Sequence, residues 1–325
     1  MIKLSANHGL AIERKLADEL AEGGRTVVIT GASGWLGSAT LAMLDASMPA
    51  SFVMEKLAVF GSSRREIVLP SGRIIQCRPM IEMVETALEH PLLFHYAYLT
   101  KDKVAEMSDE AFIALNSLIS QTVRTAVEVW RADVFLPSSG GVYRRDGALV
   151  SSYEASPYGY LKLADEASFR QVAAQAGSNL YIGRIFSLAG EFINKTSVYA
   201  LGSIIAAIGD REPIRIRASQ GVWRSYFYIG DVVNLALGLL LSGKKMGEPF
   251  DIAGDEAIEI GDLARLCSEA CGDRGHPIER PEGDFSEGDR MLGDPAASLR
   301  LMASLGLKPV ALRDQVIATA RYLMN

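Results

Sequence analysis

The chain has 325 residues, of which 49% are hydrophobic and 22% are charged, and its formal net charge is −6. This composition is typical of a globular protein with a large core and excludes a disordered chain. The length allows one large α/β domain with a smaller appendage, or two domains of ordinary size. The acidic balance, without a stripe of basic and aromatic residues, argues against nucleic acid as a partner.

The N-terminal segment predicts a helix rather than a targeting signal. Residues 8–23 carry too many charges for the apolar part of a secretory signal, while Leu10, Leu16 and Leu20 are spaced to form one apolar face. We therefore expect a helical extension over residues 1–24, packed ahead of the first strand. Because no apolar stretch is long enough to cross a membrane, we expect no membrane partner.

Cysteines and histidines give little support for disulfide or metal chemistry. The three cysteines, Cys77, Cys267 and Cys271, form no disulfide framework and fit a reducing compartment. Cys267 and Cys271 lie on an expected helix, but no second ligand pair follows at a distance suitable for zinc. The four histidines are scattered and form no HExxH-type cluster. We expect a cytoplasmic protein without a metal site.

Short apolar runs alternate with helical patterns over the first part of the chain. The runs are near-continuous, as in strands covered on both faces, and they occupy residues 26–30, 57–61, 73–77, 92–96, 133–137 and 180–185. Helical patterns lie between several of them, at residues 35–46, 110–131 and 157–176. This rhythm predicts an α/β fold with a Rossmann-type, doubly wound parallel sheet.

The strand–helix rhythm ends at about residue 187, where shorter elements rich in glycine, proline and charge begin. A last helix is expected near residues 311–324. We expect a dinucleotide-binding domain over residues 25–186, with part of 220–255, and a smaller C-terminal substrate-binding lobe over most of 187–325.

A glycine-rich turn follows the first of these strands. Residues 26–37 read TVVITGASGWLG, so that Gly31, Gly34 and Gly37 follow a buried strand and open a helix. Such glycines permit a tight turn, close approach of a pyrophosphate and close packing of helix on strand. The free N–H groups at the helix N-terminus favour an anion. We predict a dinucleotide site formed by Gly31, Ser33, Gly34, Trp35, Leu36 and Gly37.

The end of the second strand bears on the choice between NAD and NADP. A carboxylate there would bind the adenosine ribose hydroxyls of NAD, but the sequence has Gly61, Ser62, Ser63, Arg64 and Arg65. An arginine fork suits a 2′-phosphate because it gives charge-assisted bidentate bonds. We therefore favour NADP over NAD, with contacts from Ser63, Arg64 and Arg65; the alternative is a solvated loop with accidental charge.

Tyr158 and Lys162 lie four residues apart on a predicted helix and share one face. A phenol with a pKa of about 10 exchanges protons poorly at neutral pH. An ammonium about 4 Å away would lower that pKa by up to about 3 units. The pair is therefore a candidate acid–base catalyst, although a surface tyrosine with a solvated lysine is also common by chance.

A serine pair follows the strand at 133–137, and Ser139 is the candidate to hydrogen-bond a reacting oxygen. Four motifs then occur in order: the glycine turn with its GxxGxxG spacing, SSGGVY at 138–143, SPYGYLK at 156–162 and RIF at 184–186. Together they resemble the extended short-chain dehydrogenases/reductases, the NAD-dependent epimerase/dehydratase family that modifies nucleotide sugars. The resemblance extends from about residue 26 to the C-terminus.

The resemblance implies roles for these residues. Tyr158 would give or take the proton at a sugar oxygen, Ser139 would hold that oxygen, and Lys162 would bind the nicotinamide ribose and tune Tyr158. It also implies cofactor contacts by Tyr96, Ala97, Asn116 and Phe186. His95 is expected to pack in its strand rather than to act in catalysis.

On the substrate side, the resemblance implies that Arg224 binds a diphosphate and that Ser187 replaces an asparagine which contacts the substrate phosphates. Related sugar dehydratases carry an Asp-Glu pair where this sequence has Gly140 and Gly141, and glycine cannot move a proton. Of the reactions that the family catalyses, this leaves oxidation or reduction at one carbinol carbon of the sugar, C4.

The leading hypothesis is an NADP-dependent reductase of a 4-keto nucleotide sugar. The alternatives are a nucleotide-sugar 4-epimerase with tightly bound NAD and a non-catalytic, regulatory NADP-binding protein. The resemblance also implies a homodimer that pairs helices 110–131 and 157–176 into a four-helix bundle.

Overall fold

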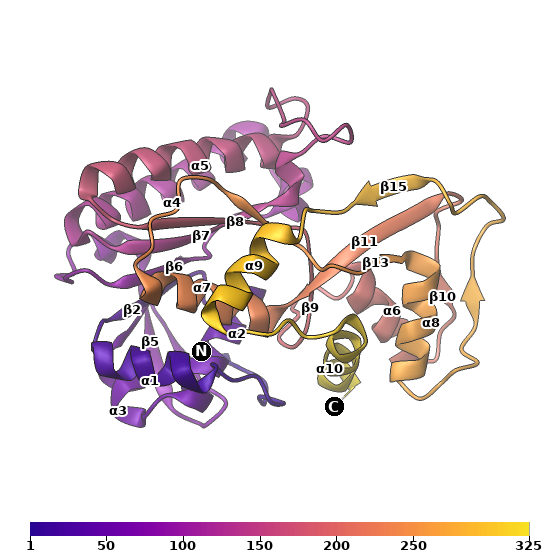
Figure 1. Cartoon of the computed structure of the whole chain (residues 1–325), viewed down its shortest axis with the longest axis horizontal. Helices are drawn as coiled ribbons and strands as arrows, with labels where there is room; N and C mark the ends of the chain where they lie inside the picture. Colours follow the sequence, from indigo (N-terminus) through magenta and orange to yellow (C-terminus); the bar gives the residue numbers. More distant parts are fainter. Residues whose placement is uncertain (325) are drawn as a thin grey trace.

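A nine-stranded sheet organises the larger part of the computed structural model, which describes residues 1–324 (Figure 1). Neighbouring strands are parallel except for the hairpin formed by β4 and β5. From edge to edge the strands are β1 (Ile2–Lys3), β4 (Arg65–Val68), β5 (Ile74–Pro79), β3 (Leu57–Gly61), β2 (Val27–Thr30), β6 (Leu92–His95), β7 (Asp133–Ser139), β8 (Leu180–Ile185) and β12 (Phe250–Ile252).

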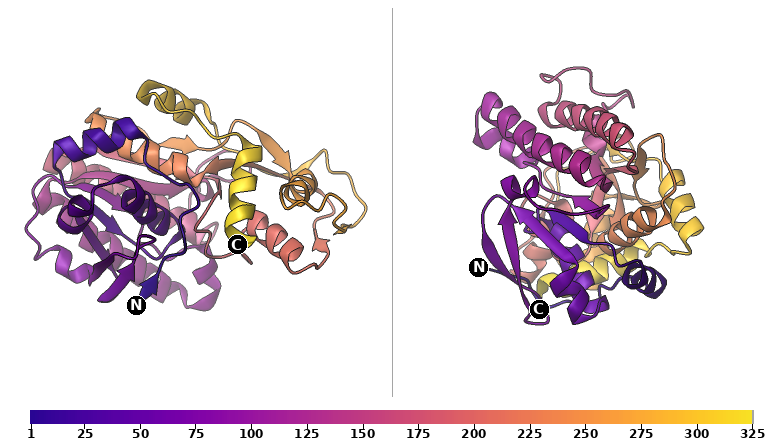
Figure 2. Two further views of the ribbon diagram at one scale, coloured as in Figure 1. Left: turned by 90° about the horizontal axis from the view of Figure 1, so that it is seen from below. Right: turned by 90° about the vertical axis from the view of Figure 1, so that its left-hand side faces the viewer.

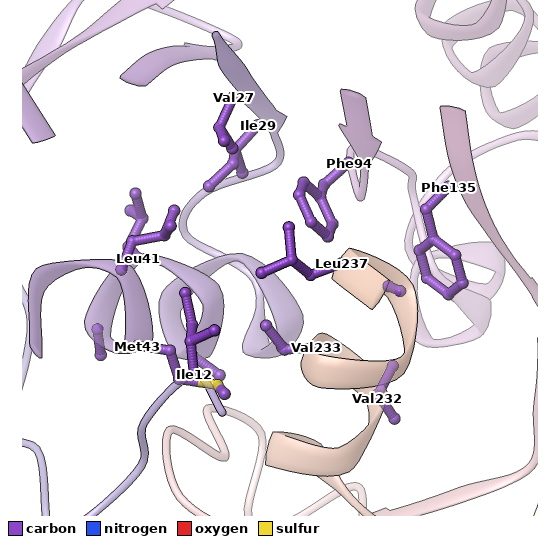
Figure 3. Close-up of a cluster of buried hydrophobic side chains, with 14 of the residues drawn as sticks. Ile12, Val27, Ile29, Leu41, Met43, Phe94, Phe135, Val232, Val233 and Leu237 are labelled. Atoms are coloured by element: carbon purple, nitrogen blue, oxygen red, sulfur yellow. The ribbon is translucent and has the colours of Figure 1, made fainter. Parts of the chain in front are cut away.

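Alternate residues of the central strands build the two faces of this sheet. Val27 and Ile29 of β2 point to one face, and Val28 points to the other. On the first face, the side chains of Val27 and Ile29 meet Leu41 and Leu237 from two covering helices (Figure 3). That face is covered by α1 (Arg14–Gly23), α2 (Trp35–Ser47), α7 (Ile229–Ser242) and α9 (Ala296–Leu305).

Two long helices, α4 (Asp109–Trp130) and α5 (Pro157–Ala176), lie side by side on the other face (Figures 1 and 2). Trp130 and Phe169 bury their rings there against Val28 and Val134. With helices on both faces of a mostly parallel sheet, the predicted α/β Rossmann-type fold is confirmed.

The hairpin strand β4 is absent from the sequence prediction, which treats Arg65 as part of a loop. Only one of its four residues, Ile67, is buried, so that no apolar run marks the strand. The hairpin places Arg65 opposite Cys77 in β5. Short elements complete this part of the chain: α3 (Ala50–Glu55) and the 3-10 turns η1 (Met80–Met83), η2 (Lys101–Glu106) and η3 (Gly140–Val142).

A smaller lobe surrounds the long strand β11 (Gly221–Tyr228), to one side of the sheet (Figures 1 and 2). Its other strands are β9 (Ser187–Ala189), β10 (Ile214–Arg215), β13 (Ala257–Glu259), β14 (Ile278–Glu279) and β15 (Gly288–Met291). Its helices, α6 (Ala200–Gly209), α8 (Ile260–Ala270) and α10 (Leu312–Met324), share one apolar core. Within residues 1–324, no helix is long and apolar enough to span a membrane.

Candidate functional site

The glycine turn between β2 and α2 has the geometry of an anion-binding loop. Gly31 has a φ of +72°, and a Cβ on it would lie 2.6 Å from the amide nitrogen of Ala97. A Cβ on Gly37 would lie 2.4 Å from the carbonyl oxygen of Gly31. Because Gly34 caps α2 without a side chain, no side chain competes for the first N–H groups of that helix. This uncapped helix start fits the pyrophosphate of a dinucleotide.

A segment of the smaller lobe packs against the same turn, a contact that no pattern in the sequence indicated. The amide of Asn194 donates to the carbonyl oxygen of Ser33 over 3.0 Å. The indole of Trp35 donates to the carbonyl oxygen of Glu191 over 2.6 Å, and its ring lies 5.2 Å from that of Tyr199. The lobe therefore contacts the predicted phosphate loop directly.

Three arginines, Arg64, Arg65 and Arg78, lie near the end of β3. The guanidinium of Arg65 donates to the hydroxyl of Ser62 over 2.8 Å, and its Nε is buried without a partner. Arg64 forms an ion pair with Glu82, to which Arg78 also donates, over 3.1 Å. Hydrogen bonding by Arg78 and then by Arg64 lowers the pKa of Glu82.

Helix α5 positions Tyr158 and Lys162. The hydroxyl of Ser156 caps the helix by accepting from the amide of Gly159, and Pro157 occupies the first turn. Lys162, only 6% exposed, donates from Nζ to the carbonyl oxygen of Pro137 in β7 over 3.1 Å. The carboxyl end of β7 and the start of α5 therefore meet at the catalytic lysine predicted from the sequence.

Ser139 completes this group at the end of β7. Its hydroxyl accepts from the amide of Gly141 over 3.0 Å, and both this hydroxyl and the ring of Tyr158 lie next to Gly141. A Cβ on Gly159 would lie 2.1 Å from the carbonyl oxygen of Gly141, so glycine is needed for this close approach. The structure thus brings together Ser139, Tyr158 and Lys162 from two separate stretches of chain.

The electrostatics of this group differ from the sequence expectation. Burial raises the pKa of Tyr158, and the neighbouring Ser139 hydroxyl only partly offsets that effect. Burial lowers the pKa of Lys162 to about 8, against the charges of Asp165 and Glu166. The predicted lowering of the Tyr158 pKa by Lys162 is not observed. The ammonium lies 6.0 Å from the centre of the tyrosine ring, and desolvation dominates at that distance.

The loop after β6 runs between the glycine turn and α5. The amide of Ala97 donates to the hydroxyl of Thr30 over 3.1 Å, and the phenol of Tyr96 accepts from the hydroxyl of Thr40 over 3.2 Å. His95 hydrogen-bonds Thr30 over 2.8 Å inside the sheet, where burial lowers its pKa to about 3. This environment agrees with packing rather than catalysis.

Asn116 of α4 fixes the same loop. Its amide accepts from the backbone N–H of Leu99 over 2.9 Å and donates to the carbonyl oxygen of Leu99 over 3.4 Å. Both the oxygen and the nitrogen of the Asn116 amide therefore bind the backbone of this loop. The sequence did not single out Tyr98, whose ring faces Lys162 from this loop.

Phe186 fills the space left by two glycines. A Cβ on Gly140 would lie 2.6 Å from its ring, as would a Cβ on Gly293. The ring of Phe186 also stacks on Tyr143, with the centroids 6.0 Å apart. The absence of a side chain at position 140, noted from the sequence, therefore has a packing role.

The two predicted substrate residues lie in the smaller lobe. Ser187 begins β9 and pairs with Tyr226 of β11. Arg224 in β11 forms an ion pair with Asp289 over 2.7 Å and donates to the carbonyl oxygen of the same residue. Its positive charge is thus partly neutralised within the lobe.

Comparisons with known proteins agree with this arrangement. A dTDP-4-dehydro-6-deoxy-D-allose reductase from Streptomyces bikiniensis is 23% identical, covering 93% of this chain and 97% of the relative. A UDP-N-acetylglucosamine 4-epimerase from Methanobrevibacter ruminantium, solved with UDP-N-acetylmuramic acid, superimposes with a TM-score of 0.72 at 18% identity, covering 92% and 98% of the chains. The UDP-glucose 4-epimerase of Thermus thermophilus, solved with NAD, gives a TM-score of 0.67 at 19% identity over 92% and 98%.

The sequence profile of the NAD dependent epimerase/dehydratase family matches residues 27–253, which include the glycine turn, Ser139, Tyr158 and Lys162. The chain belongs to this family, and is therefore an enzyme of the short-chain dehydrogenase/reductase type that uses a nicotinamide cofactor.

Proposed function

We propose that the protein reduces the 4-keto group of a nucleotide-activated sugar to a hydroxyl group, with NADPH as the reductant. The observation that carries this proposal is the meeting of Ser139, Tyr158 and Lys162 at the carboxyl edge of the sheet. In open α/β sheets this edge is where ligands bind. The similarity to dTDP-4-dehydro-6-deoxy-D-allose reductases over nearly their whole length supports the substrate class.

Ser139, Tyr158 and Lys162 have different roles in the proposed reaction. Ser139 donates a hydrogen bond to the keto oxygen, and Tyr158 delivers the proton to that oxygen as the carbon is reduced. Lys162, held by the carbonyl oxygen of Pro137, stabilises the negative charge that Tyr158 acquires. A nicotinamide ring bound beside them would supply the hydride.

Two glycines limit the enzyme to one carbon of the sugar. A side chain at position 140 would collide with Phe186, and one at position 141 would point at Ser139 and Tyr158. With glycine at both places, no carboxylate is available beside Tyr158 in this loop to remove a proton from a second carbon. This favours reduction over dehydration.

Positive charge at the adenosine end supports NADPH over NADH. Arg64 and Arg78 both pair with the carboxylate of Glu82, and the guanidinium of Arg65 donates to the hydroxyl of Ser62 in the same loop. The outer guanidinium nitrogens of Arg65, which is partly exposed, have the chemistry to bind a phosphate oxygen. Ser63, exposed in the same loop, would add a hydroxyl to this 2′-phosphate site.

A second candidate is a nucleotide-sugar 4-epimerase that retains its NAD. The contacts of Asn194 and Trp35, which tie the smaller lobe to the glycine turn, favour it because they would slow cofactor exchange. The exposed Arg64 and the positive adenosine end favour the reductase.

The smaller lobe is proposed to hold the nucleotide part of the substrate, with Arg224 and Ser187 as diphosphate contacts. A homodimer is proposed through the outer face of α4 and α5. That face exposes Leu115, Leu118, Val129 and Tyr160 to solvent, an unusual set for the surface of a monomer.

The test is a screen of dTDP-, UDP-, GDP- and CDP-linked 4-keto-6-deoxyhexoses with NADPH and NADH. We expect oxidation of NADPH that depends on the keto sugar and disappears in Tyr158→Phe. Interconversion of two 4-hydroxy sugars without net cofactor use, by protein purified with bound NAD, would establish the epimerase instead. Unchanged turnover in Tyr158→Phe would reject the proposed site.

A further inference from the structure

The ring of Tyr98 covers the ammonium group of the proposed catalytic lysine. Nζ of Lys162 lies 3.6 Å from the centre of this ring, within the range of a cation–π contact. The same ring meets that of Tyr158 edge to face, with the centroids 5.9 Å apart and the planes 77° apart. Tyr98 therefore touches both members of the acid–base pair.

The position of Tyr98 is set by the backbone on both sides of it. On one side, Ala97 donates to Thr30 and packs against Gly31. On the other, Asn116 binds both backbone groups of Leu99. Because both neighbours are held, the ring is presented to Lys162 by rigid elements rather than by a free loop.

The importance of the contact with Tyr98 depends on the other charged and polar groups around Lys162. The carboxylate of Asp165 lies one turn further along α5, where Oδ1 accepts from Ser120 and Oδ2 has no partner. Glu166 is engaged by Arg184 through two hydrogen bonds. His95 is buried and neutral, and its burial keeps it so when Lys162 is charged. The ammonium is therefore stabilised by the charges of these two carboxylates, by the carbonyl oxygen of Pro137 and by the face of Tyr98, which lies in direct contact with it.

We propose that Tyr98 is a positioning residue of the active site: its aromatic face holds the Lys162 side chain charged and directed toward Tyr158. This inference rests on the proposed roles of Tyr158 and Lys162. It assigns the effect to the ring rather than to the phenol hydroxyl. A desolvated cation–π contact corresponds to a factor of about 2 to 30 in an equilibrium or a rate.

The experiment compares Tyr98→Leu, which removes the ring, with Tyr98→Phe, which keeps it. Tyr98→Met provides a second non-aromatic variant with a flexible side chain should the leucine variant fold poorly. Tyr322→Leu, in α10, is the control for loss of a half-buried tyrosine outside this site. Each variant is assayed for reduction of the 4-keto nucleotide sugar across pH, with thermal unfolding and quenching of nicotinamide fluorescence as measures of folding and cofactor binding.

We expect kcat to fall about 2- to 30-fold in Tyr98→Leu and Tyr98→Met, with the substrate KM little changed. Tyr98→Phe and Tyr322→Leu should keep the wild-type kcat. Since the ring stabilises the protonated lysine, its loss lowers the pKa of Lys162. The alkaline limb of the kcat profile should therefore move to lower pH by roughly 0.4 to 1.5 units.

Two results would overturn the inference. One is a wild-type kcat and pH profile in folded Tyr98→Leu or Tyr98→Met. The other is a loss in Tyr98→Phe as large as in Tyr98→Leu, which would assign the effect to the hydroxyl. Tyr158→Phe and Lys162→Met, measured in the same assay, separate this failure from that of the proposed function. If those two variants retain turnover, the site itself is wrong, whereas if they lose it and Tyr98→Leu does not, only the role of Tyr98 is wrong.

Discussion

The two ends of the proposed dinucleotide site are built in opposite ways. At the nicotinamide end, Lys162 is buried between the carbonyl oxygen of Pro137 and the ring of Tyr98, with Tyr158 nearby. At the adenosine end, Arg64 is exposed and pairs with a partly exposed carboxylate. Burial thus shifts the pKa values at one end, whereas at the other end we propose that exposed charge selects the cofactor. Substitutions at the two ends should therefore separate turnover from cofactor preference.

The largest effect is expected at the nicotinamide end, in Tyr158→Phe. Loss of the proton donor should lower kcat by a factor of about 10² to 10⁴, because that is the contribution of a positioned general acid. The affinity for NADPH, measured by fluorescence quenching, should stay within a few-fold of the wild type. A simultaneous loss of cofactor affinity would mean that the two ends are not independent.

The next largest effect should be the pH dependence of kcat, which we expect to arise at the nicotinamide end alone. Burial lowers the pKa of Lys162 to about 8, so the ammonium is present below that pH and is lost as the pH rises through it. We expect kcat to fall toward a slope of about tenfold per pH unit above this value. The ratio of NADPH to NADH activity should stay constant between about pH 7.5 and 9, because arginine remains charged and a 2′-phosphate, with a second pKa of about 6, stays ionised. If the ratio of the two activities changed with pH over this range, the two ends of the site would not act independently.

At the adenosine end, Arg64→Ala and Arg65→Ala should each reduce the preference for NADPH over NADH about 10-fold, the loss expected for a hydrogen bond to a charged group. The measurement is kcat/KM with each cofactor. Arg144→Ala, an exposed arginine paired with Asp146, is the control. An equal loss with NADH and NADPH would assign these arginines to the structure of the loop rather than to a 2′-phosphate.

The smallest effect is expected from Lys195, which bridges the lobe and the loop after β6. Its ammonium contacts both carboxylate oxygens of Asp102, and the side chains are 30% and 19% exposed. A partly exposed ion pair of this kind contributes little, so Lys195→Ala should speed cofactor release only about 2- to 5-fold in stopped-flow measurements. Lys103→Ala, whose pair with Glu106 stays within η2, should leave release unchanged. An equal change in both variants would exclude a role for the bridge.

The sequence predicted the sheet, its long helices and the residues that meet at its carboxyl edge, because these depend on local patterns. Buried runs such as that of β2 and the spacing of Tyr158 and Lys162 are visible without knowledge of the fold. The hairpin strand β4 was missed because only Ile67 is buried in it. The strand boundaries at β5 and β7 also extend further than predicted.

Long-range contacts account for the rest of what the sequence did not reveal. The pKa of Tyr158 depends on how deeply α5 packs, which no spacing of residues describes. The approach of Tyr98 to Lys162 joins a loop after β6 to a helix more than sixty positions later in the chain. Likewise, the bond between Asn194 and Ser33 connects segments whose sequences carry no sign of each other.

The path of the chain limits how the two parts of the molecule can move. The backbone passes between the sheet and the smaller lobe near residues 186, 229, 253–256, 292–295 and 306–311. A proteolytic cut in any one of these connections would leave the two parts joined by the others. Any opening that admits a ligand must bend several connections together, so the lobe cannot be exchanged for another as a single inserted module.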